Sequence, residues 1–439
     1  MKSNEQSSVS ESFTLNDRAW DSIFDRYDIR EKVQRDGVFH ITANQIKEFR
    51  EPRLMTKFDT KESLPKAFGK GKEKKMSILP DSRGSYVIGY FDSYMEFPEM
   101  ERCIRHVDFP DYLQTISKTN INSEANVINV LGVTNILEDF LCENRFVQTI
   151  SGRMKSGVFD FSIHDNRNRE LHHIAVKNAQ IEIDAGFENE NCVCIMEAKN
   201  VVHKDFIVRQ VYYPYRCWSD KVQKPVRTVF MVYSNNIFRL LEYEFANKDC
   251  YSSIQFIRQK NYSFEDVGIT LDDIMECFQR TEALPEPEGI PFIQADSFNT
   301  VISLLEIIQE EPKSIHQISE TIGFATRQGD YYYNAAKYLG LANKQKDQDG
   351  IVRVRLSGLG ETVMNLPYKE RQLKYVELMF QHEIFRVVFF ASVTSTSMVG
   401  KKFISKKMIE LNLCGASLVE RRTSSVVGWL RWIFSIINE

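Results

Sequence analysis

A mixed α/β fold divided into several domains is the fold class that the 439-residue sequence predicts. The hydrophobic share of 43% and the charged share of 26% are ordinary globular values, so the chain can bury a sizeable core. Apolar runs typical of strands occur between segments of helical periodicity. A proline-rich stretch, residues 281–294, indicates an extended linker. We therefore expect an N-terminal α+β domain and three further domains, at residues 1–118, 119–285, 286–366 and 367–439.

The composition argues against membrane and secreted classes. The N-terminus is polar and no run of about 18 apolar residues occurs, so we expect neither a signal peptide nor a spanning helix. Eight cysteines are scattered without a disulfide-framework pattern, which favours a reducing cytoplasm. Cys192 and Cys194 are interpreted as strand packing. The net charge of −4 does not by itself indicate a polyanion-binding protein, although local basic stretches occur.

The second domain shows the order helix, three strands, helix, strand. We expect a first helix over residues 122–143, which carries Glu138 beside its apolar stripe. The remaining elements are strands at 157–163, 180–186 and 193–199, a helix over 204–218 broken at Pro214, and a strand at 225–233.

Two carboxylates and a lysine fall at an informative spacing on the second and third of these strands. Residues two apart in a strand share a face, so Glu197 and Lys199 project together. A hairpin through Gly186 returns Asp184 to Glu197. Oxygen ligands of this kind suit Mg²⁺, which keeps several waters for a phosphate substrate. The alternative is a structural ion pair at a strand end, since burying an unpaired charge is costly.

This arrangement resembles the PD-(D/E)xK nuclease signature. Asp184 stands for the first acid and Glu197-Ala198-Lys199 for the (D/E)xK element, while Ile183 replaces the usual proline. The resemblance implies a restriction-endonuclease-like core over residues 120–235. It also implies Mg²⁺ bound by Asp184, Glu197 and the Ala198 carbonyl, with Lys199 stabilising negative charge.

The same resemblance implies roles for two further residues. Gln210 lies on a helix similar to the Gln-containing helix of some branches of this superfamily, in which the Gln orients the site. A Glu of the first helix can join the metal, and Glu138 is the candidate, with a plain solvated Glu as the alternative.

Residues 297–356 resemble a winged helix. Three helices, at 297–309, 313–322 and 331–339, precede a hairpin whose second strand is 351–356. In such domains the third helix enters the major groove. DNA contacts are then expected from Arg327, Gln328, Tyr331 and Asn334, although many winged helices mediate only protein contacts.

Two basic stretches are further candidates for DNA contacts. Residues 50–75 hold nine Lys/Arg against four Asp/Glu, including Arg50, Arg53 and Lys57; the alternative is a solvated loop. The last segment, in a second helical or winged-helix-like domain, carries Arg421 and Arg422 ahead of an apolar helical stripe. These arginines suit phosphate binding or a charged helix cap.

The combination resembles a type II restriction endonuclease that cuts double-stranded DNA with Mg²⁺. That family implies a homodimer, no membrane association and a cognate methyltransferase. Two other classes remain open: a non-enzymatic winged-helix regulator that keeps an inert nuclease fold, and a structure-specific repair nuclease.

Overall fold

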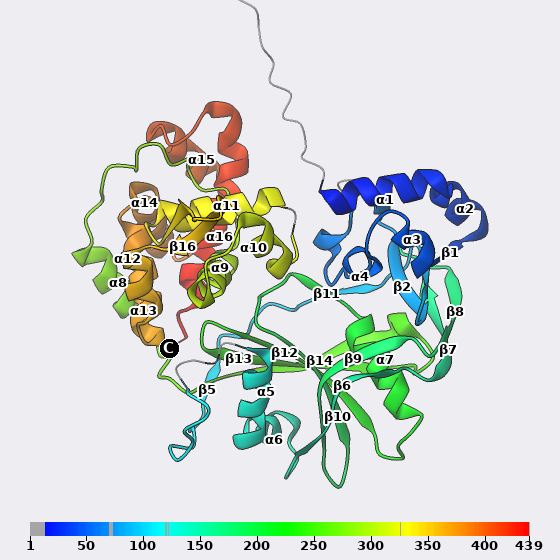
Figure 1. Cartoon of the computed structure of the whole chain (residues 1–439). Coiled ribbons are helices and arrows are strands. Elements are labelled where there is room, and N and C mark those ends of the chain that lie inside the picture. The colour runs from blue at the N-terminus through cyan, green and yellow to red at the C-terminus, as the bar shows by residue number, and fades with distance from the viewer. Residues whose placement is uncertain (1–13, 70–72, 119–120, 122, 325, 439) are drawn as a thin grey trace, which may run out of the picture.

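The computed structural model describes residues 14–438 apart from 70–72, 119–120, 122 and 325. Helices and strands are mixed, and they form an N-terminal unit, a central sheet and a C-terminal helical unit (Figure 1). Over the described ranges, no helix combines the length and apolarity needed to cross a bilayer.

The central sheet has seven strands in the order β5-β14-β13-β12-β10-β9-β6. β10 pairs antiparallel with β9 and parallel with β12. The strands are β5 (Ile104–His106), β6 (Val147–Lys155), β9 (Gln180–Glu188), β10 (Val193–Lys199), β12 (Val226–Ser234), β13 (Ile237–Phe245) and β14 (Ile254–Ser263). The predicted hairpin of residues 180–186 and 193–199 is confirmed as β9 and β10.

Helices cover both faces of this sheet because its central strands are apolar on both sides. Cys194, Met196 and Ala198 belong to the core formed with α5 (Glu124–Val133) and α6 (Ile136–Leu141). Val193 and Ile195 pack into the core on the side of α7 (Arg209–Ser219). The predicted helix over 204–218 begins only at Arg209 and continues through Pro214. Its expected first turn is instead β11 (Asp205–Ile207), which pairs with β4 (Tyr94–Glu96).

A second sheet combines strands from two distant parts of the chain. Its order is β1-β3-β2-β8-β7, and β2 pairs antiparallel with β3. The strands are β1 (Val38–Thr42), β2 (Ser77–Ser82), β3 (Ser85–Gly89), β7 (Val158–His164) and β8 (Leu171–Lys177). The strand predicted at 157–163 therefore lies outside the central sheet, where β6 takes its place. β6 is an edge strand with one buried side chain, Ile150, so its sequence lacks a strand-like apolar pattern.

Short helices pack against the N-terminal strands of this second sheet, β1, β2 and β3. They are α1 (Leu15–Arg26), α2 (Ile29–Asp36), α3 (Ala43–Lys47) and α4 (Pro52–Met55). Trp20, Phe24, Phe58 and Phe68 meet edge to face or tilted at their centre, which fixes the loop-rich segment after α4 against α1.

The C-terminal unit has a single apolar core, which runs from Val267 to Ile436 and also includes Val201 and Ile237 of the central part of the chain. Its helices are α8 (Leu271–Arg280), α9 (Phe298–Glu310), α10 (Ile315–Ile322), α11 (Thr326–Tyr338), α12 (Gly358–Met364), α13 (Tyr368–Phe380), α14 (Glu383–Thr394), α15 (Lys401–Glu410) and α16 (Val419–Ser435), and its hairpin is β15 (Ala342–Lys346) with β16 (Val352–Leu356). The expected domains 286–366 and 367–439 share this core, and α8 belongs to it as well. The proline-rich segment contacts this unit, since Leu284 N donates a hydrogen bond to the Gln381 carbonyl at 2.7 Å.

Candidate functional site

The structure brings Asp184, Glu197 and Lys199 together, as the hairpin register predicts. We call these three residues the triplet. Asp184 Oδ2 accepts a hydrogen bond from Ala198 N at 2.9 Å. Lys199 Nζ lies 2.6 Å from Glu197 Oε1 and 3.3 Å from the Ala198 carbonyl oxygen. The triplet therefore sits where β10 ends beside the parallel strand β12, an edge at which open α/β sheets commonly bind ligands.

Gln210 reaches the same carboxylate from the first turn of α7. Its Nε2 donates to Glu197 Oε1 at 2.6 Å, so this oxygen accepts from both Gln210 and Lys199. Gln210 Oε1 is buried, and it has no hydrogen-bond partner among the described residues. Gln210 is thus positioned to orient Glu197 and still carries an acceptor of its own at the site.

Burial dominates the electrostatics of the triplet. The Glu197 side chain is 9% exposed, and this burial, opposed by Lys199 and reinforced by Asp184, raises the pKa of Glu197 to about 8. Burial acts against the Lys199 ammonium, but Glu197, Glu124 and Asp184 outweigh it and raise the pKa of Lys199. Lys199 is therefore a fixed positive charge. Its charge offsets only part of the cost of burying the Glu197 carboxylate.

The donor set fits a hard divalent cation. Asp184 and Glu197 each use one oxygen in the hydrogen bonds above, and no described residue bonds to Asp184 Oδ1 or Glu197 Oε2. The Ala198 carbonyl is a third oxygen nearby. No group of three or more His, Cys, Asp and Glu side chains placed to hold a metal occurs in the described part of the chain. An ion here would complete its shell with water or substrate oxygens, as Mg²⁺ commonly does.

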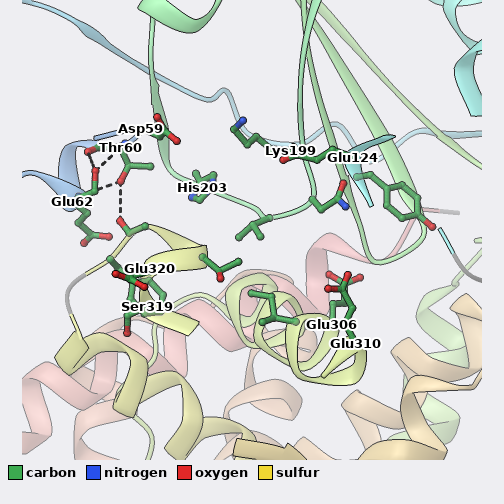
Figure 2. A pocket seen from close by; sticks show the side chains of 18 of the residues that line it. Asp59, Thr60, Glu62, Glu124, Lys199, His203, Glu306, Glu310, Ser319 and Glu320 are labelled. Carbon is green, nitrogen blue, oxygen red and sulfur yellow. Dashed lines mark hydrogen bonds between the residues drawn. The ribbon is translucent and has the colours of Figure 1, made fainter. Parts of the chain in front are cut away.

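A cavity of about 1710 Å³ opens beside the triplet, between the N-terminal unit, the end of β10 and the helices α9 and α10 (Figure 2). We call it the central cavity. Lys199 lines it, whereas Asp184, Glu197 and Gln210 are not part of its wall. Lys199 is thus the member of the triplet that a bound molecule in the cavity would meet first.

Two acids near the triplet, Glu124 and Asp59, were not among the site residues that the sequence predicts. Both line the central cavity. Partial burial raises the pKa of Glu124, and Lys199 and Asp184 act on it in opposite directions, which places it within electrostatic reach of both. A local signal did exist for Glu124, because Ser123 caps α5 and makes Glu124 its first residue.

Glu138, the candidate on the first helix, lies elsewhere. Its Oε1 accepts from Phe146 N at 3.2 Å, and it lines a separate cavity with Asn135 and Lys260. α5 and α6 are two helices rather than one, so the first helical acid near the site is Glu124.

The basic N-terminal residues share the central cavity with Lys199. Arg50, Arg53 and Lys57 line it, and Lys57 Nζ lies 3.8 Å from Asp59. Lys70 and Lys72, from the same basic stretch, lie outside the described residues.

The predicted DNA-reading residues of α11 have mixed surroundings. Arg327 is exposed and lies 5.5 Å from the Tyr331 ring, and Asn334 is half-buried. Gln328 Nε2 donates to Glu62 Oε1 of the N-terminal unit at 3.0 Å. The side chains of Tyr332, Tyr333, Ala335, Ala336 and Tyr338 are buried. One end of α11 is thus held against the N-terminal unit, and much of the helix is core.

Arg421 and Arg422 differ although they are adjacent. Arg421 is exposed, with a 3.4 Å contact to Gln294. Arg422 is buried and donates to the Phe292 carbonyl. This interior position departs from the predicted phosphate-binding surface, because the helix turn after Val419 directs Arg422 into the core.

Comparison with protein-family models matches three parts of the chain. Residues 17–88 match a domain of unknown function (DUF6996), residues 89–263 a second (DUF6997) and residues 300–438 a third (DUF7226). Neither a curated protein nor a solved structure gave a match. The third match spans both regions that the sequence divided at residue 366, in agreement with their shared core.

Proposed function

We propose that the chain is a Mg²⁺-dependent nuclease that hydrolyses phosphodiester bonds of double-stranded DNA. The observation that supports this most directly is the hydrogen-bonded triplet with Gln210 at the end of β10. The surrounding order also matches that expected for the PD-(D/E)xK core: helix α5, three strands β6, β9 and β10, helix α7, and parallel strand β12. α6, β7, β8 and β11 interrupt this order.

In the proposed reaction the chain's own residues have separate tasks. Asp184, Glu197 and the Ala198 carbonyl would hold Mg²⁺, which supplies charge neutralisation and water activation when bound. Lys199 carries a permanent positive charge toward the central cavity, so it stabilises negative charge developing on the phosphate. Gln210 keeps Glu197 in place through its 2.6 Å hydrogen bond. Arg50, Arg53 and Lys57 would bind the flanking backbone from the same cavity.

Sequence-specific recognition is the finer part of the proposal. The helices α9, α10 and α11, the hairpin β15–β16 and the bridge between Lys313 and Val354 follow the element order of a winged helix. Arg327 and Asn334 are the residues on α11 that we propose for base contacts. Restriction of foreign DNA, with a partner methyltransferase and a homodimeric nuclease, is the biological setting that fits this chemistry.

The proposal is tested by incubating the purified protein with phage DNA in Mg²⁺ or EDTA. We expect cleavage only with Mg²⁺, and loss of cleavage by at least about 100-fold in Asp184→Ala, Glu197→Ala and Lys199→Ala. Binding of the same DNA in Ca²⁺ should persist in Lys199→Ala. Glu138→Ala is the matched control, because this acid lies away from the triplet, and it should cut normally. Undiminished cleavage in EDTA, or by Asp184→Ala, would contradict the proposed site.

A further inference from the structure

The C-terminal unit contacts the rest of the protein at two edges of the central cavity, and the contacts at these edges differ. The inner edge lies at the β12–β13 turn, and the outer edge lies at the N-terminal unit. At the inner edge, Ser234 Oγ and Asn235 N in the β12–β13 turn both donate to Glu306 of α9, at 2.6 Å each. The Asn235 amide exchanges hydrogen bonds with Gln372 of α13, at 2.8 and 3.1 Å, and Gln372 is completely buried. Asn235 and Asn236 have φ of 55° and 59°, which a tight hairpin turn requires. Several hydrogen bonds therefore keep the C-terminal unit attached at the inner edge.

At the outer edge, two hydrogen bonds among the described residues join the N-terminal unit to the segment that carries α10 and α11, one of them part-buried and the other solvent-exposed. Thr60 Oγ1 donates to the Gly323 carbonyl at 2.9 Å, and Gln328 Nε2 donates to Glu62 Oε1 at 3.0 Å. We call these two hydrogen bonds the latch. The Gln328–Glu62 bond is solvent-exposed, and Gln328 Oε1 is buried without a partner among the described residues. Local opening begins where contacts are few and solvated, so the outer edge should separate before the inner one.

Acidic side chains line both sides of the central cavity. Asp59 and Glu124 lie on the side of Lys199, and Glu310 and Glu320, from α9 and α10, lie on the other (Figure 2). A phosphate backbone drawn to Lys199 would face these carboxylates at close range, where like charges repel.

We propose that the C-terminal unit is a gate over the triplet, held shut by the latch and hinged on the β12–β13 turn, and that nucleic acid enters only when the latch opens. The gate makes contact of nucleic acid with Lys199 and closure of the latch mutually exclusive. Its effect on cleavage rests on the proposed function, but the movement itself does not.

Hydrogen exchange and DNA binding test the gate in the full-length protein. The variants are Glu62→Ala and Gln328→Ala, with Glu361→Ala on the exposed face of α12 as control. We expect amides of residues 58–64 and 315–324 to exchange severalfold faster in both latch variants. Both should also bind a short mixed-sequence DNA duplex about fivefold or more tightly in Ca²⁺, because opening is no longer opposed. Adding that duplex to the unmodified protein should speed the same exchange.

The outcomes separate the gate from the nuclease. Exchange and affinity equal to those of Glu361→Ala in both latch variants, together with no effect of duplex on the unmodified protein, would overturn the gate, whether or not DNA is cut. Faster exchange and tighter binding without cleavage in Mg²⁺ would support the gate and refute the nuclease.

Discussion

Glu197 is the residue at which stability and the proposed chemistry conflict most clearly. It is buried beside a second carboxylate, Asp184, and Lys199 compensates only part of the charge. Such a site is costly to fold without a cation and is suited to holding one. The metal-free protein should therefore gain stability when this carboxyl is neutralised.

In EDTA, we expect Glu197→Gln to become more stable relative to wild type as the pH rises. The folded-state pKa of Glu197 is raised to about 8, above its unfolded value near 4.5. The stability that its proton provides is complete below the unfolded pKa and is lost as the pH rises through the folded pKa. Between about pH 5 and pH 8 the difference should grow by on the order of 2 to 4 kcal/mol. Urea unfolding at several pH values measures it.

Glu182→Gln provides the control, since Glu182 is exposed on β9, the strand that pairs with the strand of Glu197. It should show no comparable growth. A difference between Glu197→Gln and wild type that stays constant with pH would mean that Glu197 is ionised throughout and paired fully with Lys199.

At the scale of elements, the sequence predicted those helices and strands that are determined by a local pattern of apolar and polar residues. The β9–β10 hairpin was predictable because Ile181 and Ile183 alternate with polar residues and β10 is an apolar run. β6 was not predictable, since an edge strand with a single buried side chain has no such alternation. Glu124 was overlooked because the break between α5 and α6, at Thr134 and Asn135, divides one apolar stripe into two helices.

Two helical glycines test how closely elements approach one another. In α16, a Cβ on Gly428 would lie 1.9 Å from the Asp296 carbonyl oxygen, whereas a Cβ on Gly132 in α5 would meet nothing within 4 Å. We expect Gly428→Ala to destabilise the protein by about 1 to 3 kcal/mol or more, because the backbone at Asp296 must move. Gly132→Ala should stabilise it by about 0.5 to 1 kcal/mol, through helix propensity. Thermal unfolding distinguishes the two, and similar effects would mean that α16 does not pack backbone to backbone at this point.

At the scale of the whole molecule, chain order is a poor guide to the units. β7 and β8 lie in the sequence of the central unit but complete the sheet of the N-terminal one. α8 precedes the proline-rich segment but packs in the C-terminal core. Such long-range pairing leaves no local pattern, because each strand or helix needs only some apolar neighbour to cover it. The predicted boundary at residue 285 therefore followed composition and divided a packed unit.

This organisation predicts different behaviour for two shortened chains. A chain ending at residue 290 keeps α8 but loses α13, which covers Ile274 and Cys277. Its exposed apolar stripe should cause self-association and binding of a hydrophobic dye. A chain ending at residue 265 stops just after β14 and lacks α8, so it should bind less dye and remain closer to monomeric. Size-exclusion chromatography with dye fluorescence compares them at equal concentration. A monomeric, dye-silent chain ending at residue 290 would place α8 with the central sheet and restore the boundary at residue 285.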